Sequence, residues 1–71
     1  RWIMTNLKYL RMKKNLSIAQ LAKATRIPKI TLIRLENGHA QSISFKNLNK
    51  LCHFFNLSNV NELIGERRIE P

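Results

Sequence analysis

The segment Arg26-Ile27-Pro28 constrains the fold of this chain more than any other feature. Proline is accepted in the first turn of a helix and pushes the residue before it toward extended backbone, so this segment predicts a tight connection between two helices. We expect one helix over residues 17–25 and the next over residues 29–37. Gly38 then ends the second helix, because glycine readily takes the left-handed conformation that follows a helix.

Capping residues and apolar spacing predict the other helices. Leu7 and Leu10 recur at helical spacing and indicate a first helix over residues 6–14. Ser17 is a good N-cap, and Gln20, three residues later, supplies the return bond of a capping box.

Two further helices are expected in the C-terminal part of the chain. Ser44 is the cap of the fourth helix, and its apolar stripe comprises Phe45, Leu48, Leu51, Cys52 and Phe55. Ser58 or Asn59 begins a short fifth helix that carries Val60, Leu63 and Ile64 and is closed by Gly65. No segment alternates apolar and polar residues in the manner of a strand.

These signals predict an all-α fold, a compact five-helix bundle in one domain over residues 6–65. Residues 1–5 are expected to be an N-terminal extension with Trp2 at the periphery, and residues 66–71 a charged C-terminal tail. A chain of 71 residues has little room for a catalytic cleft. The sequence shows none of the common catalytic signatures, namely paired carboxylates, a glycine-rich phosphate loop, or a nucleophile spaced to a base. We therefore expect neither an enzyme nor a cofactor.

The charge balance restricts the class of partner. The chain has 13 Lys and Arg against 4 Asp and Glu, a formal net charge of +9. From Arg1 to Asn61 the only acidic residue is Glu36. Such a cationic field attracts nucleic acid, an anionic membrane or an acidic protein, and composition alone does not choose among them.

Cysteine usage and hydropathy favour a soluble, cytoplasmic protein. Cys52 is a single cysteine without a metal-type spacing, and we interpret it as a small apolar residue of the fourth helix. Neither His39 nor His53 has metal-ligand spacing, so no metal is expected. No apolar run approaches the roughly 20 residues that span a bilayer, and no secretory signal is evident.

The helices over residues 17–25 and 29–37 have the lengths and the short connection of a helix-turn-helix. If Leu32 and Leu35 pack inward, an opposite face with both charged and apolar side chains remains exposed, and a single helix fits the major groove of B-DNA. Arg34 is suited to bind guanine bidentately, Lys29 to reach a guanine or a phosphate, and Ile30 to cover a thymine methyl. The base-reading candidates on this face are Lys29, Ile30, Ile33 and Arg34.

Phosphate contacts are expected at the starts of the second and fourth helices, where unpaired backbone N–H groups favour anions. Ser17, Ser44 and Lys14 assist there. His39, in the loop after the third helix, is a further phosphate candidate, with a plain solvent-exposed position as its alternative.

The pattern as a whole resembles a known family. It includes Leu7, Leu10-Arg11, Leu16-Ser17, Leu21-Ala22, Ile27, Leu32, Arg34-Leu35-Glu36-Asn37-Gly38, Leu51, Phe55-Asn56-Leu57-Ser58 and Glu62-Leu63-Ile64. These residues are similar to the phage-repressor and Cro-like (XRE-type) helix-turn-helix family. The resemblance implies a transcription regulator, acting as a repressor, that reads double-stranded DNA through its third helix and binds as a homodimer.

The resemblance also implies residue roles. It adds Thr31 to the base-reading candidates. It also adds phosphate contacts at Ile18, through its backbone, and at Asn37, Gln41, Ser42, Ser44 and Phe45. It pairs Arg11 with Glu36, and the helix dipole gives an independent reason, since a carboxylate near a helix C-terminus needs a cation nearby. Four positions depart from the family pattern: Ile18 stands in place of glutamine, Arg26 in place of glycine, Pro28 in place of the Ser or Thr cap of the third helix, and Ile33 in place of a polar residue. Arg26 therefore either takes a positive φ at a cost of about 1 kcal/mol or reshapes the turn.

Some alternatives stay open. Ile30 and Ile33 are core residues if the third helix is rotated, or they form a protein contact in an antitoxin-like or adaptor module. The dimer contact is expected at the fifth helix and the segment leading into it, with Leu57, Val60, Leu63 or Ile64 partly exposed.

Overall fold

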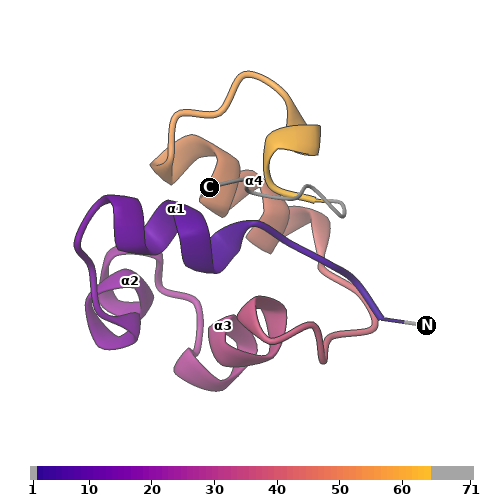
Figure 1. The fold of residues 1–71 in the computed structure, drawn as a ribbon, viewed down its shortest axis with the longest axis horizontal. Coiled ribbons are helices and arrows are strands. Elements are labelled where there is room, and N and C mark those ends of the chain that lie inside the picture. The colour runs from indigo at the N-terminus through magenta and orange to yellow at the C-terminus, as the bar shows by residue number, and fades with distance from the viewer. Residues whose placement is uncertain (1, 65–71) are drawn as a thin grey trace.

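The computed structural model describes residues 2–64. This part of the chain contains four α-helices, α1 (Leu7–Lys13), α2 (Ile18–Thr25), α3 (Lys29–Glu36) and α4 (Phe45–Phe54), and one 3-10 turn, η1 (Val60–Glu62). In the view of Figure 1, α2 and α3 lie below α1 and α4 lies above it; α2 packs against both α3 and α4, and α3 also packs against α1. The predicted all-α class is confirmed, and the first three helices begin and end within one residue of their predicted bounds.

The count of five helices was wrong, because the expected fifth helix is only the single turn η1. The Asn59 side chain accepts a hydrogen bond from the Asn61 backbone at 2.8 Å and starts this turn. The backbone that follows is paired elsewhere. Asn6 N donates to Leu63 O at 2.8 Å, and Thr5 and Ile64 form an antiparallel bridge, so the segment before α1 takes the groups that a longer helix would use. Gly65, expected to close the helix, lies outside the described residues.

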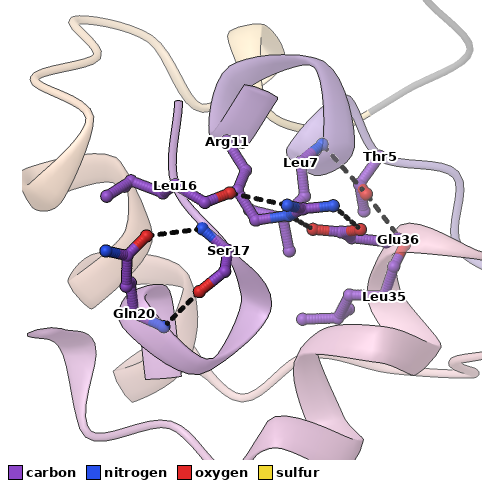
Figure 2. Close-up of polar contacts among 8 residues, drawn as sticks. All are labelled: Thr5, Leu7, Arg11, Leu16, Ser17, Gln20, Leu35 and Glu36. Atoms are coloured by element: carbon purple, nitrogen blue, oxygen red, sulfur yellow. Dashed lines mark hydrogen bonds and ion pairs between the residues drawn. The ribbon is translucent and has the colours of Figure 1, made fainter. Parts of the chain in front are cut away.

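The capping box predicted before α2 is confirmed. Gln20 N donates to Ser17 Oγ at 3.0 Å, and Ser17 N donates to Gln20 Oε1 at 2.8 Å (Figure 2). The two bonds satisfy backbone donors that a helix start otherwise leaves unpaired. They fix the point at which the chain enters α2.

The connection between α2 and α3 is a tight turn in which Arg26 adopts the left-handed conformation, with φ 62° and ψ 29°. Of the two possibilities left by the sequence, Arg26 therefore takes the positive φ. Ile27 follows it into the core with 1% of its surface exposed. Pro28 is the N-cap of α3, with φ −55° and ψ 142°, one position before the first helical turn in which it was expected.

The core gathers apolar side chains from all four helices, from the α2–α3 turn and from the segment after η1. Its buried members are Leu7, Leu21, Ile27, Leu32, Leu35, Leu51, Phe55 and Leu63. Helices of seven to ten residues are marginal in isolation, so this shared core supplies most of their stability. It also sets the orientation of α3.

Residues 2–5, expected to be an extension, are bonded to the body of the domain. Ile3 N donates to Ala40 O at 2.8 Å, and Thr5 Oγ1 donates to Leu35 O at 2.9 Å near the end of α3. Figure 1 shows this segment running beside the loop between α3 and α4. The charged tail, residues 66–71, lies outside the described part of the chain.

Arg11 and Glu36 form the ion pair that joins α1 to α3. Arg11 Nε lies 2.5 Å from Glu36 Oε2, and Arg11 Nη2 lies 3.1 Å from Glu36 Oε1. A third donor, Arg11 Nη1, bonds to Leu16 O at 2.7 Å (Figure 2). The hydrogen bonds to the Glu36 carboxylate raise the pKa of Arg11, against the opposing effect of burial.

Candidate nucleic-acid interface

Helix α3 has one face in the core and one face at the surface. Leu32 and Leu35 are buried, with 0% and 1% exposure, whereas Lys29 and Arg34 are exposed. The inward orientation predicted for the two leucines is confirmed. Because the leucines anchor α3 through one side, the cationic side chains project from the other.

Two isoleucines lie on the exposed side of α3. Ile30 is 62% exposed and Ile33 is 37% exposed. The rotated alternative, in which they are core residues, is therefore wrong. An aliphatic side chain left this open to water is available for contact with a partner, and Thr31, half-buried, lies between the two faces.

Thr31 and Arg34 meet the loop after α3 at a pocket of about 380 Å³. The loop contributes His39, Gln41 and Ser42, which are the candidates for phosphate contacts in this part of the sequence. The fold thus brings base-reading and phosphate-binding candidates together at one place. Trp2, which was expected to lie at the periphery, forms a further wall of the pocket.

The starts of α2 and α4 are both capped by serine hydroxyls at the surface. Ser17 Oγ accepts from Gln20 N, and Ser44 Oγ accepts from Asn47 N, each at 3.0 Å. A serine hydroxyl that accepts one bond still has its own O–H to donate. Both serines are exposed, so capping leaves each hydroxyl able to donate to a phosphate oxygen.

The other phosphate candidates differ in their surroundings. Asn37 is exposed and is the C-cap of α3, and Phe45 is 81% exposed at the start of α4. Ile18 is half-buried against the core, so its side chain is committed to packing while its backbone stays in the first turn of α2. Lys14 Nζ lies 5.9 Å from the ring centroid of Phe54, and the side chain lines a separate pocket between α1 and the end of α4.

A family model for helix-turn-helix proteins matches residues 7–59, which include all four helices. The chain belongs to the XRE-type helix-turn-helix family, with phage-repressor and Cro-like proteins. This is a family of DNA-binding transcription regulators. Neither the curated proteins nor the solved structures that were compared with the chain gave a match.

The expected dimer residues of this helix-turn-helix protein are not equally accessible. Val60 is 42% exposed, and Leu57 and Ile64 are half-buried. Leu63 was expected to be partly exposed, and this was wrong: it is 0% exposed and belongs to the core. The bridge between Thr5 and Ile64 turns this part of the chain inward, which explains the burial.

Cys52 is half-buried on α4. Burial and the nearby charge of Glu62 both raise the pKa of its thiol, which disfavours the reactive thiolate. Among residues 2–64, no cluster of three or more His, Cys, Asp or Glu is placed to hold a metal ion. In the same part of the chain, no helix has the length and apolar character needed to cross a bilayer.

Proposed function

We propose that this helix-turn-helix protein is a sequence-specific transcription repressor that places α3 in the major groove of duplex DNA. The observation that carries the proposal is the division of α3, with Leu32 and Leu35 buried and Arg34 exposed. The major groove is about 12 Å wide and admits one helix. Arg34 then reads guanine, Ile30 covers a thymine methyl, and Lys29 contacts a guanine or a phosphate.

The electrostatic field around α3 supports the same proposal. Glu36 is the only acidic residue from Arg1 to Asn61, its side chain is 5% exposed, and Arg11 neutralises it. The cations on the exposed face therefore meet no opposing surface charge from that stretch of the chain. Such a surface attracts the phosphate backbone and speeds encounter with DNA.

We further propose that the protein acts in the cytoplasm as a homodimer. A two-fold dimer places its two reading helices about 34 Å apart, one turn of DNA. Val60, Leu57 and Ile64 remain the candidates for the dimer contact, since they are not fully buried in the monomer. A dimer of this kind requires that the preferred DNA sites contain two inverted half-sites at that spacing.

Selection of binding sites from random duplex DNA tests the proposal, followed by measurement of Arg34→Ala. Loss of a bidentate guanine contact is expected to weaken binding about 5- to 150-fold for each half-site and to relax base preference at one position in each half-site. Lys13→Ala is the matched control, because it removes one cation from α1 outside the α3 face. If Arg34→Ala bound the selected site with unchanged affinity and base preference, the reading role of Arg34 would be wrong.

A protein-interaction module is the second candidate, and the exposure of Ile30 and Ile33 favours it. Salt separates the two functions. Each neutralised phosphate steepens the fall of log K with log salt by about 0.9, whereas a contact built on isoleucines responds weakly. A flat salt dependence toward duplex DNA, together with no selected sequence, would favour the protein partner.

A further inference from the structure

The pocket beside α3 joins three separate parts of the chain. Thr31 and Arg34 come from α3, His39, Gln41 and Ser42 from the following loop, and Trp2 from the segment before α1. Its volume of about 380 Å³ falls within the range of about 300–1,000 Å³ that is usual for ligand sites.

Trp2 is positioned at this pocket by its contact with the loop after α3. Its ring meets the His39 ring edge to face, with centroids 6.1 Å apart and planes at 69°. The neighbouring backbone bond from Ile3 N to Ala40 O, 2.8 Å long, fixes the segment against the loop. Trp2 nevertheless remains 56% exposed. A large aromatic side chain that is positioned by neighbours and left open to water is available for an intermolecular contact.

The lining of the pocket matches a phosphate with its sugar. The Gln41 amide and the Ser42 hydroxyl donate hydrogen bonds to a phosphate, while Arg34 adds positive charge at the edge that faces the groove, and none of the lining residues within residues 2–64 is acidic. The face of the tryptophan ring supplies an apolar wall of the kind that packs against a deoxyribose. A small free anion accepts hydrogen bonds from the same donors but has no apolar group to pack against the tryptophan ring.

We propose that the pocket receives one deoxyribose-phosphate unit of the duplex backbone and that Trp2 packs against its sugar. This inference rests on the proposed function, because the pocket shares Thr31 and Arg34 with the reading face of α3. The backbone that borders the groove occupied by α3 then passes over the loop. The segment before α1 thereby extends the DNA interface beyond the helix-turn-helix itself.

Fluorescence tests the proposal directly, since Trp2 is the single tryptophan of the chain. The probe is the duplex obtained by selection, added to the wild-type protein. We expect a change in the emission of Trp2 and a clear fall in its quenching by acrylamide when the duplex binds. A single-stranded oligonucleotide of the same sequence is expected to produce neither change, and an equal response to it would overturn the assignment to duplex backbone.

Two substitutions measure what the ring contributes. Trp2→Ala is expected to weaken binding of the selected duplex about 2- to 10-fold, while Trp2→Phe, which keeps an aromatic wall, stays closer to wild type. Met12→Ala is the matched control, because Met12 has nearly the same exposure, 57%, and lies outside the pocket. Thermal unfolding of each variant is measured in parallel, and the exposure of Trp2 predicts little change.

The outcomes separate this inference from the function on which it rests. A wild-type protein that binds no duplex at all contradicts the proposed function. If the wild type binds and Arg34→Ala weakens binding, but Trp2 stays open to acrylamide and Trp2→Ala binds as wild type, only the pocket assignment is overturned. The fluorescence of the wild type keeps the test decisive even if Trp2→Ala fails to fold.

Discussion

The guanidinium of Arg11 joins both carboxylate oxygens of Glu36 to the carbonyl of Leu16, and so connects α1, the end of α3 and the entry to α2. The side chains are 14% and 5% exposed, which keeps the pair largely out of water. A carboxylate near a helix C-terminus is opposed by the helix dipole, and Arg11 provides the compensating charge. The pair thus holds α3 against α1 while neutralising the carboxylate that α3 itself carries.

Glu36→Ala is expected to destabilise the protein by about 3 kcal/mol, because it leaves the Arg11 guanidinium largely buried without its counterion. Glu62→Ala is the control. Glu62 accepts a surface bond from Ser58 at 3.0 Å, and its loss is expected to cost about 0.5 kcal/mol. Urea unfolding at fixed salt measures both changes, and equal midpoints for the two variants would contradict the structural role of the pair.

The double variant Arg11→Met with Glu36→Leu extends that test. Removing both charges leaves no unpaired charge between α1 and the end of α3, so this variant should be more stable than Glu36→Ala alone. A double variant that was the less stable of the two would indicate that Arg11 acts mainly through Leu16.

Arg26→Gly is expected to stabilise the protein by about 0.5–1 kcal/mol. The left-handed conformation costs a non-glycine residue about 1–2 kcal/mol, and glycine removes this strain. Glycine also makes the unfolded chain more flexible, which offsets about 0.5–1 kcal/mol of the gain in stability. Lys23→Gly, within α2, is the matched control: it also exchanges one cation for glycine and is expected to lose about 1 kcal/mol. Chemical unfolding compares the two, and a loss in both variants would mean that φ 62° at Arg26 stores no strain.

Leu32→Ala and Ile30→Ala should affect different properties, stability and DNA binding respectively, although the residues are only two positions apart on α3. Leu32 is fully buried, so its truncation is expected to cost about 2–5 kcal/mol of stability. Ile30 is 62% exposed, and its truncation is expected to change stability by less than about 0.5 kcal/mol. Under conditions where both variants are folded, only Ile30→Ala should weaken binding to the selected duplex.

Unfolding curves and DNA titrations of the same preparations decide that comparison. A large loss of stability in Ile30→Ala would place its side chain in the core, against the structure. Unchanged binding in Ile30→Ala would leave its exposed side free for a protein partner instead.

The sequence alone was sufficient to predict the positions of the four helices and the face of α3 that points into the core. Caps act within a few residues, so Ser17 with Gln20, and Ser44 at the start of α4, could be recognised from local order alone. The inward placement of Leu32 and Leu35 follows from helical periodicity, which is also local. The Arg11–Glu36 pair was suggested by the family resemblance and by the dipole argument.

Only the tertiary structure decided the features that depend on distant backbone groups. The fifth helix stops after one turn because Asn6 and Thr5 pair with Leu63 and Ile64, and this pairing also buries Leu63. Trp2 reaches the α3 pocket because Ile3 bonds to Ala40. Both contacts join residues more than 30 positions apart in the sequence, where neither periodicity nor capping carries a signal. Local propensity therefore determined where the helices form, and long-range hydrogen bonding determined what lies beside the reading helix.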